Sequence, residues 1–208
     1  MRLVAENISG ERGGEILFSG VDFSLDSGRS LVVTGPNGTG KSTLLRIIAG
    51  LLPPADGTIR LEGSDEDVSV GAACHYLGHL NGLKATLTVR ENLLFWQRFS
   101  GTPKLALTEA LAAVGLPGIG HLPFGYLSTG QKRRTAIARL LLNHRPVWLL
   151  DEPTAGLDKA SEERFGGLME EHLDAGGIIV AATHLPLGLQ GARELRLGDG
   201  QAGLVGNA

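Results

Sequence analysis

The chain has 208 residues, of which 42% are hydrophobic, enough for a folded domain with a core, so a disordered chain is excluded. Its 31 glycines are about twice the average share but follow no G-X-Y period, so a collagen-like chain is excluded too. The net charge is −3, and no run of like charges forms a tail, so the charge pattern gives no electrostatic footprint for nucleic acid. We therefore expect no nucleic-acid partner, and any anionic ligand must be bound locally.

The sequence also bears on the cellular compartment. The one cysteine, Cys74, excludes an intramolecular disulfide, and we interpret it as a buried small hydrophobic residue. The start of the chain contains Glu6 and lacks the apolar core of a secretory signal. The long charge-free runs at 110–131 and 175–192 are interrupted by Gly, Pro and His, so neither predicts a membrane helix. We expect a cytoplasmic location.

Alternating strands separated by glycine-containing turns are predicted at the start of the chain. The pattern changes near residue 30, where a compact apolar strand at 31–33 is followed by a glycine-rich loop and by a helix at 42–49. Further strands are predicted at 58–62 and 72–77. The predicted early strands cover 3–8, 15–18 and 21–26.

From about 85 to 145 the hydrophobic periodicity is helical, and afterwards the pattern of buried parallel strands resumes. The order predicts an α/β fold with a mixed parallel sheet and helices in the core, an N-terminal antiparallel β-layer and an inserted α-helical subdomain. The predicted core covers 1–78 and 146–208, and the subdomain covers about 79–145. The later predicted elements are helices at 89–96, 105–114, 130–142 and 161–173 and strands at 147–150, 178–182, 194–197 and 203–205.

The glycine-rich loop matches the phosphate-binding pattern G-x-x-x-x-G-K-[ST], with a strand before it and a helix after it, as the pattern requires. Its backbone N–H groups can turn toward phosphate oxygens, Lys41 can neutralise the β- and γ-phosphates, and Ser42 can offer its hydroxyl to Mg²⁺. The alternative is a glycine-rich turn with an incidental lysine. The predicted phosphate-binding residues are Gly35, Pro36, Asn37, Gly38, Thr39, Gly40, Lys41, Ser42 and Thr43.

Two carboxylates, Asp151 and Glu152, end a buried apolar strand, where their desolvation is costly without a nearby cation. We expect Asp151 to hold Mg²⁺ through water and Glu152 to polarise an attacking water. A strand ending in Asp-Glu is usually only a solvated strand end, but the phosphate loop favours the catalytic interpretation. His184 follows a second apolar strand, so we expect it to contact the γ-phosphate or the water, although a lone histidine is more often structural.

A further short motif, Leu127-Ser128-Thr129-Gly130-Gln131, precedes a predicted helix. In one interpretation, Ser128 is the N-cap of that helix and has no other role. Alternatively, the capped helix start can also bind phosphate that belongs to a second copy of the chain.

Together, these motifs resemble those of the nucleotide-binding subunits of ATP-binding cassette (ABC) transporters over essentially the whole chain. Residues 127–131 are similar to the family signature LSGGQ with Thr129 for a glycine, residues 155–158 to the D-loop, and His184 to the switch histidine. The resemblance implies a P-loop NTPase core that binds and hydrolyses ATP with Mg²⁺. It also implies a head-to-tail homodimer, with ATP between the phosphate loop of one copy and the signature of the other. The nucleotide contacts it implies outside the phosphate loop are Ser128, Thr129, Gly130, Gln131 and Asp158.

Two positions depart from the family pattern. The loop ahead of residues 87–92 usually carries a glutamine that coordinates metal or water, and His79 stands at or next to that position. The aromatic residue that normally stacks on adenine is missing, because residues 3–17 contain no Phe, Tyr or Trp. Arg12 can stack instead through its planar guanidinium.

Within the family, residues 76–84 and 127–140 are most similar to the ATP-binding subunits of bacterial cytochrome c maturation systems, often called haem exporters. This implies a peripheral ATPase on the cytoplasmic face of the inner membrane, with separate integral membrane subunits, whose hydrolysis drives release of a haem-loaded chaperone. The alternatives are the ATPase of another ABC importer or exporter and a soluble ABC ATPase acting on ribosomes or DNA. A small-molecule kinase does not account for the signature-like residues 127–131 and the D-loop-like residues 155–158.

Overall fold

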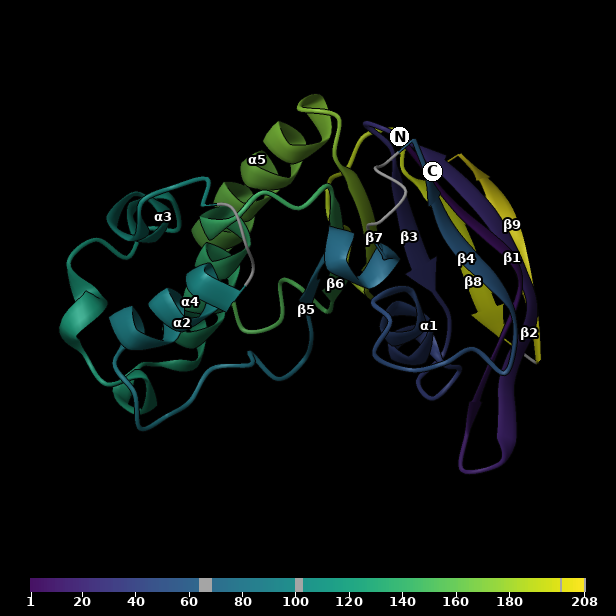
Figure 1. Cartoon of the computed structure of the whole chain (residues 1–208), viewed down its shortest axis with the longest axis horizontal. Coiled ribbons are helices and arrows are strands. Elements are labelled where there is room, and N and C mark those ends of the chain that lie inside the picture. Colours follow the sequence, from purple (N-terminus) through teal and green to yellow (C-terminus); the bar gives the residue numbers. More distant parts are fainter. Residues whose placement is uncertain (64–68, 100–102, 199, 208) are drawn as a thin grey trace. The chain divides into compact units, whose positions relative to one another are not determined.

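The computed structural model describes residues 1–63, 69–99, 103–198 and 200–207, and it divides the chain into two compact units (Figure 1). Unit 1 comprises Met1–Gly78, Arg145–Pro153 and Met169–Ala208. Unit 2 comprises His79–His144 and Thr154–Leu168. The sheet lies in unit 1, and most of the helical residues lie in unit 2.

Unit 1 contains a nine-stranded sheet in the order β4-β1-β2-β9-β8-β3-β7-β6-β5. Strands β5, β6, β7, β3 and β8 run parallel to one another, and β1 pairs antiparallel with β2 and β4. Strand β9 pairs antiparallel with β8 and parallel with β2. The strands are β1 (Arg2–Arg12), β2 (Glu15–Asp26), β3 (Ser30–Thr34), β4 (Asp56–Glu62), β5 (Cys74–Leu77), β6 (Val147–Asp151), β7 (Ile178–Ala182), β8 (Arg193–Gly198) and β9 (Gly200–Asn207). The predicted α/β class with an antiparallel β-layer is confirmed.

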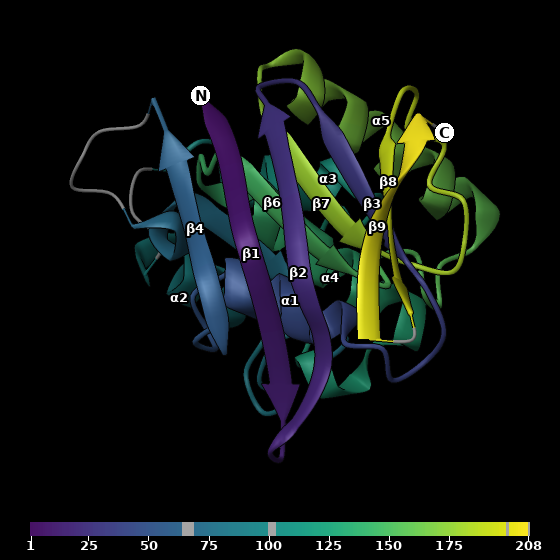
Figure 2. The ribbon, with the colours of Figure 1, turned by 90° about the vertical axis from the view of Figure 1, so that its right-hand side faces the viewer.

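The core of unit 1 forms around helix α1 (Lys41–Ile48), which contacts β1, β6 and β7. In Figure 2, α1 lies behind β1 and β2. Its apolar face is buried with side chains from both parts of the sheet, among them Phe18 of β2 and Leu149 of β6. Every residue of β6 and β7 is buried, as expected of parallel strands covered on both faces. This packing fixes the start of α1 beside the carboxyl ends of β3, β6 and β7.

Three predicted strand boundaries were wrong. The early strands are longer than predicted, because Gly10 and Gly20 lie inside β1 and β2 instead of in turns. Gly10 packs directly under the Phe18 ring, where a Cβ atom would collide with it, and the strand register shifts beside it. The strand predicted at 72–77 begins only at β5, because Ser69 caps a 3₁₀ turn, η1 (Val70–Ala73).

Cys74 is buried at the start of β5, and burial raises the pKa of its thiol to about 12. The thiol therefore stays protonated and packs as a small hydrophobic group, as the sequence predicted.

Unit 2 contains α2 (Val89–Phe99), α3 (Leu107–Ala113) and α4 (Thr129–Leu142), with the short 3₁₀ turns η2 (Ile119–His121) and η3 (Phe124–Tyr126). Helix α4 packs against both α2 and α3, and Arg139 of α4 lies 4.4 Å above the Trp96 ring of α2. Helix α5 (Lys159–Asp174) begins in unit 2 and ends in unit 1. Among the described residues, none of the helices is both long enough and apolar enough to cross a bilayer.

Candidate functional site

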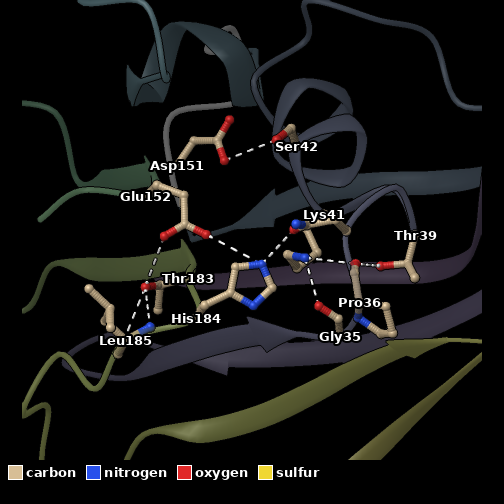
Figure 3. Close-up of polar contacts among 11 residues, drawn as sticks. Gly35, Pro36, Thr39, Lys41, Ser42, Asp151, Glu152, Thr183, His184 and Leu185 are labelled. Carbon is tan, nitrogen blue, oxygen red and sulfur yellow. Dashed lines mark hydrogen bonds and ion pairs between the residues drawn. The ribbon is translucent and has the colours of Figure 1, made fainter. Parts of the chain in front are cut away.

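The phosphate loop connects β3 to α1 in unit 1, and its shape depends on glycine (Figure 3). Gly35 has φ 132°, and a Cβ atom there would collide with the carbonyl oxygen of Leu197. Gly40, at φ 97°, is the N-cap of α1, and a Cβ atom there would lie 2.6 Å from the Phe18 ring. No side chain of the described structure caps the first turn of α1. Its backbone N–H groups therefore remain available to an anion.

Lys41 lies inside this loop with only 8% of its surface exposed. Its Nζ donates to the carbonyl oxygens of Gly35 and Pro36, at 2.7 and 2.9 Å. Burial lowers the pKa of the Lys41 ammonium, and the nearby carboxylates of Glu152 and Asp151 act in the opposite direction. The lysine is thus a buried positive charge held at the mouth of the loop, where an anionic ligand would meet it.

Asp151 is the last residue of β6 and is 3% exposed. Its Oδ1 accepts a hydrogen bond from Ser42 Oγ at 3.0 Å (Figure 3). This bond links the first turn of α1 to the end of β6 and brings two oxygen atoms together there. Mg²⁺ prefers oxygen ligands and is usually held by one or two carboxylates together with phosphate oxygens and water. The Asp151 carboxylate and the Ser42 hydroxyl fit that requirement.

Glu152 has a left-handed backbone, with φ 45°, which is uncommon for a residue with a side chain. Its N–H donates to Ala182 O of β7 at 2.8 Å, which helps to hold this conformation. The hydroxyl of Thr183 lies 3.3 Å from Glu152 Oε2 and 3.2 Å from Leu185 O, so its one proton is shared between these two acceptors. These bonds fix the Glu152 side chain next to the phosphate loop, in the place predicted for a residue that acts on water.

His184 meets the phosphate loop through Asn37, whose Oδ1 lies 2.8 Å from His184 Nε2. The amide oxygen only accepts hydrogen bonds, so Nε2 carries the proton. The same nitrogen lies 3.8 Å from Glu152 Oε1. His184 therefore links the phosphate loop to Glu152. Its contact with phosphate or water stays a prediction.

These groups line a cavity of about 220 Å³, and all of its lining residues belong to unit 1. Most of the predicted phosphate-loop residues line it, together with both strand-end carboxylates and His184. Arg12, predicted to stack on adenine, lines it as well, beside Leu17. The lining residues are Arg12, Leu17, Asn37, Gly38, Gly40, Lys41, Ser42, Thr43, Asp151, Glu152 and His184.

The signature residues lie in unit 2, where they start helix α4. Ser128 Oγ accepts from Gln131 N at 3.2 Å, and Gln131 Oε1 accepts from Ser128 N at 2.9 Å, which is a capping box. The N-cap interpretation of Ser128 is confirmed. Contacts of Ser128, Thr129, Gly130 and Gln131 with nucleotide from a second copy stay predictions.

Asp158 and His79 also belong to unit 2. Asp158 Oδ1 accepts from Ser161 N at 2.8 Å at the start of α5, and the bonds with Ser161 lower the pKa of Asp158. His79 is exposed. Among the described residues, no group of three or more His, Cys, Asp or Glu side chains could hold a metal ion. Metal coordination by His79 stays a prediction.

Two residues of the site were missed by the sequence analysis. Tyr76 donates from its hydroxyl to Asp151 Oδ2 at 3.3 Å, and Thr183 holds Glu152. Both lie near the carboxyl ends of buried strands, at the edge where parallel sheets bind ligands. That position was the signal that could have identified them.

Comparisons with known proteins show which sequences and structures the chain is similar to. The family model described as "ABC transporter" matches residues 18–155. The chain is 68% identical over 199 residues to the cytochrome c biogenesis ATP-binding export protein CcmA of Mesorhizobium japonicum, covering 95% of this chain and 98% of that protein. It is 55% identical to the protein of the same name in Rhizobium meliloti, again covering 95% and 98%.

Solved structures show the same architecture. The dimeric structure of a bacterial ABC transporter cassette matches with a TM-score of 0.80 and 26% identity, covering 96% of this chain and 95% of that one. A dimeric post-hydrolysis state of an ATP-binding cassette bound to ADP and phosphate matches with a TM-score of 0.81 and 25% identity, covering 99% and 97%.

Proposed function

Because the chain belongs to the ABC transporter family, we propose that it is the ATP-binding and ATP-hydrolysing subunit of a complex that powers haem export, or release of a haem-loaded chaperone, in cytochrome c biogenesis. The similarity to cytochrome c biogenesis export proteins over almost the full length of both chains carries this proposal. The phosphate loop alone would not, since one fold and one loop serve many functions.

In this proposal the loop binds the triphosphate of ATP. The backbone N–H groups at the start of α1 and the Lys41 ammonium contact the phosphate oxygens, which requires Nζ to leave the carbonyls of Gly35 and Pro36. Ser42 and Asp151 would hold Mg²⁺. When bound, Mg²⁺ neutralises charge on the phosphate oxygens.

Hydrolysis is assigned to the residues at the ends of β6 and β7. Glu152 orients a water and accepts its proton while the water oxygen forms a bond to the γ-phosphorus and the bond to the leaving ADP oxygen breaks. His184 hydrogen-bonds an oxygen of the transferred phosphoryl group through its Nε2–H, which requires that proton to leave Asn37 Oδ1. Thr183 keeps the Glu152 carboxylate in place.

Adenine is assigned to the surface formed by Arg12 and Leu17. Arg12→Ala is expected to weaken ATP binding about fivefold, because a stacked guanidinium contributes on the order of 1 kcal/mol. Isothermal titration of the chain with ATP measures this change. Arg2→Ala is the matched control, since Arg2 is also a β1 arginine but pairs with Asp26, at 3.6 Å, outside the cavity.

Inorganic triphosphate separates stacking from charge in the same experiment. It has no base, so Arg12→Ala should leave the dissociation constant of triphosphate unchanged if the arginine acts on adenine. Unchanged ATP affinity in Arg12→Ala would remove the residue from the base site.

For its partners, we propose that two copies pair head to tail on ATP binding and that separate integral membrane subunits hold the complex at the cytoplasmic face of the bacterial inner membrane. Two solved dimeric structures of one similar cassette support the pairing. The export-protein names of the curated relatives support the membrane partners.

A deletion strain tests the proposed function. Cells that lack the chain should lose covalently bound haem from their c-type cytochromes, measured by haem staining of gels, while haem-binding b-type cytochromes remain. The wild-type chain should restore the stain and Lys41→Ala should not. Normal c-type cytochromes in the deletion strain would refute the haem role, and recovery of the purified chain with ribosomes or DNA would favour a soluble ABC ATPase.

A further inference from the structure

Tyr76 touches the candidate cation site from the strand next to Asp151. It lies on β5, which pairs parallel with β6, and its hydroxyl lies 3.3 Å from Asp151 Oδ2. Ser42 binds the other oxygen, Oδ1, at 3.0 Å. The carboxylate is thus held at both oxygens by hydroxyl groups from two different elements, which sets its rotation about the Cβ–Cγ bond.

The direction of these hydrogen bonds follows from the groups themselves. A carboxylate oxygen only accepts, so the hydroxyl of Tyr76 donates to Asp151 Oδ2 and the hydroxyl of Ser42 donates to Asp151 Oδ1. Both hydroxyl protons therefore point toward Asp151.

The Tyr76 ring is also positioned from its other side. It packs against the hydrophobic core of unit 1. Gly78 leaves the space the ring occupies, because a Cβ atom there would lie 2.8 Å from Tyr76 Cε1 and 3.1 Å from its hydroxyl oxygen. The backbone of Gly78 is outside the left-handed region, so the close approach of the ring is what calls for glycine.

We propose that Tyr76 is a positioning residue for the Mg²⁺ site, which orients the Asp151 carboxylate so that Mg²⁺ can join it to bound ATP. This inference rests on the proposed function. A group that orients a metal ligand typically changes metal affinity by about 10- to 100-fold when it is removed. Loss of the Tyr76 hydroxyl should therefore affect nucleotide binding only when Mg²⁺ is present.

Tyr76→Phe tests this role in the full chain with a non-hydrolysable ATP analogue. The dissociation constant of the analogue is measured with Mg²⁺ and again in EDTA. The constant in EDTA divided by the constant with Mg²⁺ is the factor by which Mg²⁺ increases affinity. We expect this ratio to fall about tenfold in Tyr76→Phe, with the constant in EDTA unchanged. The matched control is Tyr126→Phe, which removes a hydroxyl from an 88% exposed tyrosine and should leave both constants unchanged.

A second variant keeps the hydroxyl but moves the ring. Gly78→Ala should also lower the ratio, because its methyl group displaces Tyr76. An unchanged ratio in Tyr76→Phe would overturn the inference, and so would an equal weakening in EDTA and in Mg²⁺, which marks a merely structural role. A wild-type chain that binds no analogue would instead refute the proposed function.

Discussion

Glu152→Gln is expected to reduce ATP hydrolysis by about 100-fold or more while ATP affinity stays within about twofold of wild type. Glutamine has the shape of glutamate and can accept the Thr183 hydrogen bond, but it cannot take a proton from water. The loss therefore falls on the chemical step. Phosphate release under saturating Mg-ATP measures the rate, and titration with ATP measures affinity.

The control for Glu152→Gln is Glu171→Gln, the same chemical change at an exposed residue of α5 outside the cavity. It should hydrolyse ATP at the wild-type rate. Hydrolysis at that rate by Glu152→Gln would exclude Glu152 as the residue that activates water.

Glu152→Gln also tests the proposed pairing of two copies. With ATP bound and not hydrolysed, Glu152→Gln should accumulate as a dimer in light scattering, and removal of ATP should return it to monomer. A monomer at saturating ATP would contradict the pairing without affecting the assignment of Glu152.

Lys41→Ala is expected to weaken ATP binding by about 10- to 100-fold, because it removes a charge-assisted bond of about 1.5–3 kcal/mol to the phosphates. Direct titration with ATP is the measurement, since any loss of hydrolysis would follow from the loss of binding. The contrast with Glu152→Gln, which binds ATP but does not hydrolyse it, separates the two residues.

Lys41 also has a structural role, since its ammonium binds the carbonyls of Gly35 and Pro36. Lys41→Met serves as a second variant because it fills the same space without charge. Both variants should weaken ATP binding while their thermal unfolding remains cooperative. Wild-type ATP affinity in a folded Lys41→Met chain would contradict the role of the lysine.

Much of the fold could be predicted because its strongest patterns are local. The apolar runs that became β6 and β7 are buried on both faces, so their sequence alternates little and is easily identified. One error occurred where a residue of the neighbouring strand decides the structure. Gly10 continues β1 because Phe18 of the partner strand covers it, and no local rule distinguishes that glycine from a turn.

The same distinction applies to the candidate site. The phosphate loop and the Asp151-Glu152 pair were predicted with their surroundings, because contiguous residues supply each of them. The contacts of Tyr76 with Asp151 and of His184 with Asn37 join residues far apart in the chain. The left-handed backbone of Glu152 has no sequence signal either, since glutamate rarely adopts it. These features depend on strand register, which the sequence does not specify to the residue.

The most direct test of the account is phosphate release from Mg-ATP by the purified full chain, alone and with its membrane subunits. We expect phosphate release to require Mg²⁺, to fall to background in Glu152→Gln and, at ATP concentrations below the wild-type dissociation constant, to fall at least about tenfold in Lys41→Met. Release by these two variants at the wild-type rate would show that ATP is hydrolysed elsewhere and would contradict the site described for this chain.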